Sequence, residues 1–314
     1  MDKNYFNLHP DNKLFEMLSK EHAPKWWQIL LNDKDLYCNV RKNNRINVYY
    51  RGASVMSLVY DDSTNAIKAK IHNYYLGYDK DLCRQRNVEY GNVEQAPEDI
   101  VECLPSIKKR VEANKKNIAC LDGDEKHGKN YSSEKYVQSQ MYLEDPSYID
   151  TEFALSLDDG TPIRIDLVKL STDGAICFEE LKLVDDTRLR SKDSDPAEII
   201  EQMSRYEQFL TEAGEIKGEH HEPIIVEYYG KVLTIMEKIG ILRTSVKPST
   251  VRDYVFLRIE QIYTKKTADR DKLIDEVKNV CKEFHSNISD VLKTIKLCNR
   301  VWLYAFEFQS IDRK

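Results

Sequence analysis

The sequence predicts an α/β (α+β) protein, with an N-terminal β-rich module before a mixed sheet that is flanked by helices. Residues 36–75 contain four short segments rich in Tyr, Val and Ile, separated by turn residues. Residues 133–210 alternate between helical and strand patterns in a mixed order, which is typical of a sheet covered by helices. At 314 residues and 41% hydrophobic composition, the chain can bury cores for two domains.

The N-terminal module is predicted to begin with a helix over residues 14–31, whose apolar residues have helical spacing. Strands are predicted at 36–40, 46–51, 55–60 and 66–75. Turn residues such as Asn43, Asn44 and Gly52 separate these strands, so we expect an antiparallel meander. We assign residues 1–95 to this module and consider it a candidate recognition domain.

The rest of the chain divides into a connector and a larger domain. Residues 96–130 are predicted to form a helical connector, with a helix over 97–117, and a loop. Residues 131–314 form the predicted α/β domain. Its helices are expected at 133–143, 196–210, 224–239 and 268–284, and its strands at 149–157, 163–170, 175–184, 254–263 and 300–309.

Composition limits the classes of function. With 47 basic and 53 acidic residues the formal net charge is −6, so any contact with nucleic acid must be local. The seven cysteines lie at least 17 positions apart, which excludes a zinc ribbon and a disulfide framework and favours a cytoplasmic protein. No apolar run approaches the roughly 20 residues of a membrane span, so we expect no membrane partner.

Three charged residues on neighbouring predicted strands form the strongest candidate site. Side chains alternate along a strand, so Glu180 and Lys182 point to the same side, about 7 Å apart. The turn at 171–174 predicts that the strand carrying Asp166 pairs with theirs as a hairpin. Two carboxylates can bind a hard cation such as Mg²⁺ or Mn²⁺, while the ammonium orients water or offsets charge on a phosphate.

A Glu-x-Lys sequence is common by itself, and this chain contains it at 180–182, 215–217 and 276–278. Only the first lies in an apolar strand that follows a strand bearing an aspartate. The alternative interpretation is a solvated charge pair on an amphipathic hairpin. Because the flanking residues, such as Phe178, predict a buried strand, where unpaired charges are costly, we favour the catalytic interpretation.

The next predicted helix starts at Asp195-Pro196, an N-cap followed by a proline at the first helical position. Gln202 and Tyr206 lie four residues apart and therefore share a face of this helix. Their amide and phenol could hold the strand of Glu180 or a nucleic-acid phosphate. Taken alone, a core tyrosine beside a surface glutamine explains them better.

Together these residues resemble the PD-(D/E)XK nuclease superfamily, which has a restriction-endonuclease-like fold. The Gln202-x-x-x-Tyr206 spacing resembles its RecB-like exonuclease branch. The resemblance covers residues 133–210, and Ile165 replaces the proline of the pattern. It implies Asp166, Glu180 and Leu181 as metal ligands and Lys182 as a catalytic residue. It also implies an acidic residue on the preceding helix; Glu134 matches best, with Glu144 and Glu152 as weaker substitutes.

The resemblance implies a Mg²⁺- or Mn²⁺-dependent deoxyribonuclease, with DNA favoured over RNA, that acts in restriction, phage defence or repair. A homodimer or a defence-complex partner is compatible with it. One alternative is an inactive nuclease fold that serves as a nucleic-acid-binding or scaffold protein. Another is a nucleotide-binding enzyme that uses residues 123–129, which have the Gly and Lys spacing of a P-loop. There Asn130 replaces the hydroxyl residue that binds Mg²⁺, which favours a polar loop.

The N-terminal module also contains cations interleaved with aromatic residues on its predicted strands. Such a pattern can grip phosphates and stack bases, although an ordinary solvated β surface explains it equally well. The residues concerned are Arg41, Lys42, Arg45, Tyr49, Tyr50, Arg51, Lys68, Lys70, His72, Tyr74 and Tyr75.

Overall fold

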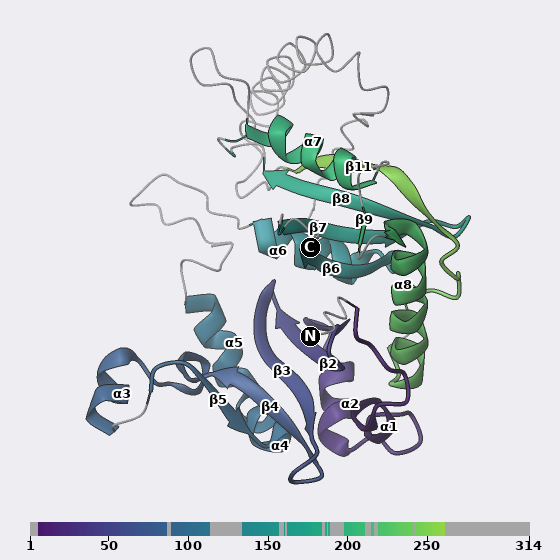
Figure 1. The fold of residues 1–314 in the computed structure, drawn as a ribbon. Coiled ribbons are helices and arrows are strands. Elements are labelled where there is room, and N and C mark those ends of the chain that lie inside the picture. Colours follow the sequence, from purple (N-terminus) through teal and green to yellow (C-terminus); the bar gives the residue numbers. More distant parts are fainter. Residues whose placement is uncertain are drawn as a thin grey trace. The chain divides into compact units, whose positions relative to one another are not determined.

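The computed structural model describes residues 6–86, 89–113, 134–156, 160, 162–183, 186, 188, 198–210, 215–216, 219–241 and 243–260 (Figure 1). The helix predicted at 268–284 and the strand predicted at 300–309 lie outside these residues. The described chain has an α+β fold with two multi-stranded sheets, as expected. No helix in these ranges is long and apolar enough to cross a bilayer.

The chain divides into two compact units that interleave in sequence. Among the described residues, the first unit comprises those within 6–113, 134–149 and 227–248, and the second comprises those within 150–226 and 249–260. The sequence suggested consecutive segments at 1–95, 96–130 and 131–314 instead. Contacts between residues distant in sequence define the units, and periodic patterns do not reveal such contacts.

The first unit contains a five-stranded antiparallel sheet in the order β1-β2-β3-β4-β5. The pairing of the first four strands confirms the predicted meander. The last predicted strand ends early, because the chain turns into the short helix η1 (Asn73–Leu76), which ends at Gly77 with φ of 102°. The strands are β1 (Leu36–Arg41), β2 (Arg45–Tyr50), β3 (Ala53–Asp61), β4 (Ala66–His72) and β5 (Asn92–Gln95).

Prolines divide two predicted helices of this unit. The first prediction becomes α1 (Lys13–Met17) and α2 (Lys25–Asn32), because Pro24 is extended and caps α2. The connector becomes α4 (Pro97–Glu102) and α5 (Leu104–Ala113), since Pro105 lacks the N–H that a continuous helix needs. The unit also contains α3 (Lys80–Arg86) and α6 (Glu134–Glu144).

The second unit contains the four-stranded sheet β11-β8-β7-β6. Strands β7 and β8 form the predicted antiparallel hairpin, whereas β11 runs parallel to β8, so the sheet is mixed as expected. Helix α7 (Glu198–Leu210) packs on β7 and β11. The strands are β6 (Tyr148–Ser156), β7 (Pro162–Leu170), β8 (Ala175–Leu183) and β11 (Thr250–Glu260).

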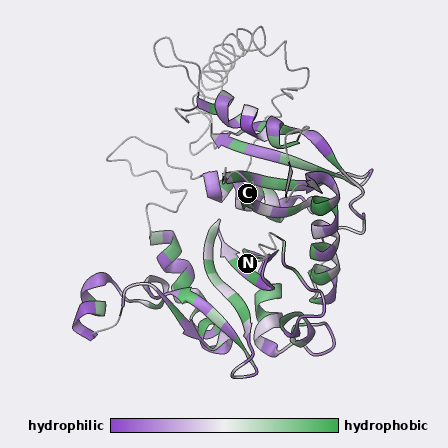
Figure 2. Ribbon diagram, in the orientation of Figure 1, coloured by the Kyte–Doolittle hydropathy of each residue, from purple (hydrophilic) through white to green (hydrophobic). Residues whose placement is uncertain are grey.

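Beyond α7 lie the short strands β9 (Glu215–Ile216) and β10 (Glu219–His220), which pair with each other. Helix α8 (His221–Lys238) follows, with hydrophobic and hydrophilic residues alternating along it (Figure 2). It begins in the second unit and continues into the first at Glu227.

Aromatic residues form the core of the second unit around β8. The ring of Phe153 lies 4.8 Å from that of Phe178 and 6.3 Å from that of Phe209, measured between centroids. Phe178 and Leu181 of β8 are both fully buried, although they point to opposite faces of the sheet. Strand β8 is therefore buried on both faces, so its charged side chains also lie in the interior.

Candidate active site

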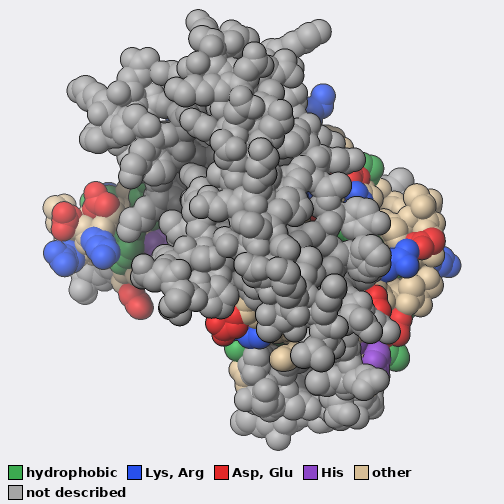
Figure 3. Space-filling model, turned by 90° about the horizontal axis from the view of Figure 1, so that it is seen from above, with side chains coloured by type: hydrophobic (Ala, Val, Ile, Leu, Met, Phe, Trp, Pro, Cys, Tyr) green, Lys and Arg blue, Asp and Glu red, His purple; other side chains and the backbone are tan. Residues whose placement is uncertain are grey.

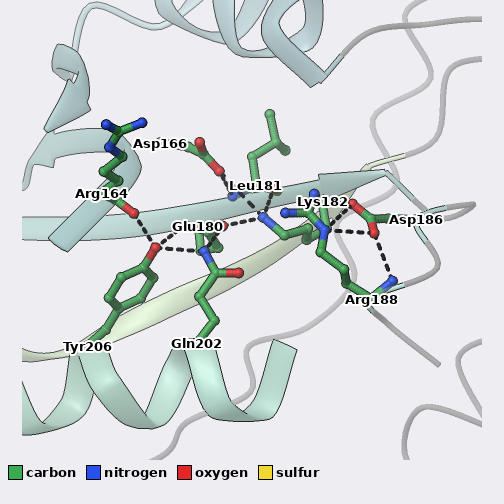
Figure 4. A network of polar contacts seen from close by, with 9 residues as sticks. All are labelled: Arg164, Asp166, Glu180, Leu181, Lys182, Asp186, Arg188, Gln202 and Tyr206. Atoms are coloured by element: carbon green, nitrogen blue, oxygen red, sulfur yellow. Dashed lines mark hydrogen bonds and ion pairs between the residues drawn. The ribbon is translucent and has the colours of Figure 1, made fainter. Parts of the chain in front are cut away.

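The β7–β8 hairpin brings Asp166 beside Glu180 and Lys182 (Figure 4). The register pairs Leu167 with Glu179, which places Asp166 next to the backbone of Glu180 and Leu181. Oδ2 of Asp166 accepts a hydrogen bond of 2.9 Å from the Leu181 N–H. The aspartate is thus fixed across the hairpin by the backbone of the neighbouring strand.

The ammonium of Lys182 lies among three oxygen atoms. It donates to Oε1 of Glu180 and, at 2.9 Å, to the carbonyl oxygen of Leu181. Its nitrogen also lies 3.8 Å from Oδ2 of Asp166. The side chains of Lys182 and Glu180 are only 1% and 2% exposed, whereas that of Asp166 is 29% exposed. The cluster is therefore buried except at Asp166, which opens toward solvent.

Helix α7 supplies two further residues that hold the carboxylate of Glu180. Nε2 of Gln202 donates to Oε1 of Glu180 at 2.6 Å and to the hydroxyl of Tyr206 at 2.7 Å. The Tyr206 hydroxyl contacts Oε2 of Glu180 at 3.1 Å and the carbonyl oxygen of Arg164. One turn of helix separates Gln202 from Tyr206, so both reach the same carboxylate. The structure thus brings this pair against the strand of Glu180.

Burial and neighbouring charge control protonation in this cluster. Burial, together with the nearby Asp166, raises the pKa of Glu180 to about 7. Burial also raises the pKa of Asp166, although the positive charge of Lys182 opposes the shift. The pKa of Tyr206 is raised by burial and by the adjacent Glu180, so its hydroxyl stays protonated at neutral pH. Such perturbed groups cluster at functional sites.

The donor set suits a hard cation. Mg²⁺ and Mn²⁺ prefer oxygen ligands, and the oxygens of Asp166, Glu180 and Leu181 already surround one positive charge, the ammonium of Lys182. Among the described residues no group of three or more His, Cys, Asp or Glu side chains could hold a metal ion. A metal here would therefore depend on two carboxylates, a backbone carbonyl and water.

Two arginines near the cluster were given no functional role from the sequence. Arg188 is held by Asp186, whose Oδ1 accepts from the Arg188 backbone N–H at 2.8 Å and from Nε at 3.0 Å. Its positive charge opposes in part the rise that burial causes in the pKa of Asp166, so it acts on the cluster. Arg164 lies two residues before Asp166 on β7 and is exposed, with its guanidinium on the side of the Asp166 carboxylate (Figure 4). The alternation of the strand already predicts that Arg164 shares a face with Asp166.

Other predicted residues lie elsewhere. Glu134 begins α6 in the first unit, so it is not among the residues that the second unit brings together, and its role stays a prediction. The P-loop-like segment 123–129 lies outside the described residues. On the N-terminal sheet, Tyr49 and Tyr50 are 2% and 3% exposed, and Tyr49 stacks on Tyr37. The proposed stacking of bases on Tyr49 and Tyr50 is therefore wrong, because protein covers these rings.

Comparison with known proteins adds no relative to this description: no protein-family model, curated protein or solved structure matches the chain. The described part is an α+β protein with a buried cluster of two carboxylates and a lysine on a mixed sheet. The resemblance to PD-(D/E)XK nucleases therefore stays a prediction from the sequence.

Proposed function

We propose that the chain is a metal-dependent nuclease that hydrolyses nucleic-acid phosphodiester bonds, with DNA the favoured substrate. One observation carries the proposal: the ammonium of Lys182 lies among the oxygens of Asp166, Glu180 and Leu181, beside a strand that is buried on both faces. A buried ion pair contributes little stability compared with hydrophobic residues of similar volume. A functional role explains its presence better than stability does.

Each residue has a defined part in this proposal. Asp166, Glu180 and the carbonyl of Leu181 would hold Mg²⁺ or Mn²⁺, which supplies Lewis-acid polarisation of the phosphate and activation of water when bound. Lys182 lies close enough to orient the attacking water or to offset charge that develops on the phosphate. Gln202 and Tyr206 fix the orientation of the Glu180 carboxylate through their hydrogen bonds.

The opening of the cluster at Asp166 supports substrate access from that side. Asp166 is the most exposed of the three charged residues, and the exposed Arg164 lies on the same side. A nucleic-acid backbone that approached Asp166 would therefore meet a cation beside the carboxylate, which offsets repulsion of the phosphates.

A second candidate is a nuclease fold that binds nucleic acid without cleaving it. Both carboxylate oxygens of Glu180 already have partners in the protein, so metal binding must compete with Lys182, Gln202 and Tyr206. Cleavage assays with Mg²⁺, Mn²⁺ or EDTA on linear and circular DNA and RNA separate the two candidates. Metal-dependent cutting that is lost in Lys182→Ala supports the nuclease. Binding without cutting, in parent and variant alike, supports the second candidate.

A further inference from the structure

Two pairs of a cation and an aromatic ring lie on the surface of the first unit, beside α3. The guanidinium carbon of Arg86 lies 5.4 Å from the ring centroid of Tyr78, and Nζ of Lys80 lies 5.8 Å from that of Tyr90. Tyr90 is 37% exposed and Tyr78 is half-buried, while both cations are exposed. We call these four residues, together with Arg110, the Tyr78–Tyr90 surface.

A buried asparagine fixes the backbone under both rings. Nδ2 of Asn73 donates to the carbonyl oxygen of Glu89 at 2.8 Å, and its backbone N–H donates to Gly91 at 2.9 Å, so it holds the segment that carries Tyr90. The backbone carbonyl oxygen of Asn73 accepts a hydrogen bond of 3.1 Å from the Tyr78 N–H. Asn73 is 1% exposed. The two rings therefore project from one fixed base.

The charge on this surface is available to an anion. Among the described residues, no acidic side chain forms an ion pair with Lys80, Arg86 or Arg110. The guanidinium of Arg110 lies against the backbone of Gly77, where an added Cβ would come within 2.9 Å of Nη2. Lys80 and Arg86 thus lie over the two rings and Arg110 lies beside the residue before Tyr78, and none of them pairs with a described carboxylate.

The acidic residues of α3 have other contacts. Oδ1 of Asp79 accepts from the Leu82 N–H at 2.7 Å and so caps the helix, and Asp81 pairs with Arg84 at 3.5 Å. Figure 2 shows α3 mostly in purple, and Figure 3 shows blue, red and green side chains gathered at the edge where α3 lies. Helix α3 is therefore mainly polar.

We propose that the Tyr78–Tyr90 surface binds single-stranded nucleic acid. Exposed aromatic rings offer faces on which unpaired bases stack, and adjacent cations hold the phosphates between those bases. A duplex buries the faces of its bases and cannot use the rings in this way. This surface would be a second contact for the substrate of the proposed nuclease. The inference rests on the proposed function only in taking nucleic acid as the partner.

The first unit also contains a matched control pair. Nζ of Lys13 lies 5.4 Å from the ring centroid of the half-buried Tyr60, so this pair has similar geometry. It lacks a second ring–cation pair held on a common base. Replacing Tyr60 tests whether any half-exposed tyrosine of the module affects binding.

The experiment measures fluorescence anisotropy of a labelled oligothymidylate, an oligouridylate and a DNA duplex with the full chain in EDTA, which prevents metal-dependent cleavage. Tyr78→Ala and Tyr90→Ala are each expected to raise the Kd for the single strands by at least about fivefold, as for loss of one base–aromatic stack. Tyr78→Phe, Tyr90→Phe and Tyr60→Ala should bind like the parent. Arg86→Gln should weaken binding and flatten its dependence on salt.

The proposal is overturned if the parent binds neither single strand. It is also overturned if the parent binds the duplex as tightly as the single strands and Tyr78→Ala does not change that binding, or if Tyr60→Ala weakens single-strand binding as much as Tyr78→Ala does. Thermal melting verifies that each variant is folded. Hydrolysis of a small chromogenic phosphodiester should be unchanged in the control variant Tyr60→Ala. If binding follows these expectations but no phosphodiester is cleaved with Mg²⁺ or Mn²⁺, the surface stands and the nuclease proposal fails.

Discussion

The ammonium nitrogen of Lys182 lies 3.8 Å from Oδ2 of Asp166, across the hairpin that joins their strands. The same ammonium contacts Glu180 and the carbonyl oxygen of Leu181, so the Lys182 side chain lies near all three residues that are proposed to bind the metal. The lysine thus compensates in part for the repulsion between two buried carboxylates.

Removing only one partner of the buried ion pair should destabilise the protein. Lys182→Met leaves the Glu180 carboxylate without its cation, and we expect the free energy of unfolding to fall by about 3–5 kcal/mol. The double variant Glu180→Gln/Lys182→Met removes both charges and should recover much of this loss. Urea denaturation at about pH 8 measures both effects. If the double variant is less stable than Lys182→Met, the pair has mainly a structural role.

Tyr206→Phe should reduce both stability and activity. The phenol contacts Oε2 of Glu180 and the carbonyl oxygen of Arg164, which would lose a donor inside the protein. We expect a loss of about 1–3 kcal/mol in unfolding free energy. Cleavage should fall roughly 10- to 100-fold, as for other residues that orient a metal ligand. The exposed Tyr90→Phe is the control, and equal cleavage by both variants would remove Tyr206 from the positioning role.

The stability of the protein should fall as the pH rises from about 4.5 to about 7. The pKa of Glu180 is about 7 in the folded chain, against an ordinary value of 4.5, so the folded state binds more protons between these values. The stability that this difference provides is fully present below the lower value and is lost as pH rises through the higher one. The raised pKa of Asp166 acts in the same direction. Urea denaturation from about pH 5 to 8 should show that the free energy of unfolding depends less steeply on pH in Glu180→Gln than in the parent. The same dependence on pH in both proteins would contradict this prediction.

Gly52 should tolerate no side chain. Its φ is 77°, and an added Cβ would lie 2.1 Å from the carbonyl oxygen of Lys135 in the first turn of α6. We expect Gly52→Ala to lower the free energy of unfolding by more than about 1 kcal/mol. Gly91→Ala is the matched control, because nothing lies within 4 Å of the added atom. Similar denaturation curves for the two variants would show that α6 adjusts without cost.

Local sequence patterns predicted the structure correctly where the contacting residues are close in sequence. Strand alternation and a short turn predicted the hairpin that brings Asp166 to Glu180, and helical spacing placed Gln202 and Tyr206 on one face. From the sequence, this face could hold either the strand of Glu180 or a nucleic-acid phosphate, because strand alternation does not specify which helix covers a sheet.

Other features depend on structure that no periodic pattern encodes. The pairing of Asp186 with Arg188 occurs after the end of β8, where no alternation guides the assignment. The burial of Tyr49 depends on Tyr37 of the neighbouring strand, so its sequence neighbours alone suggested an open surface. The pair of Tyr78 and Arg86 lies outside the predicted strands, so strand alternation does not indicate it.

The most direct test of the central claim compares cleavage of labelled DNA and RNA by the parent and by Lys182→Ala, with Mg²⁺, Mn²⁺ or EDTA. Lys231→Ala is the control, since this lysine lies on α8 and pairs only with Glu227 among the described residues. We predict metal-dependent cutting by the parent and Lys231→Ala, and none by folded Lys182→Ala. Equal cutting by folded Lys182→Ala, or cutting that persists in EDTA, would contradict the proposed site.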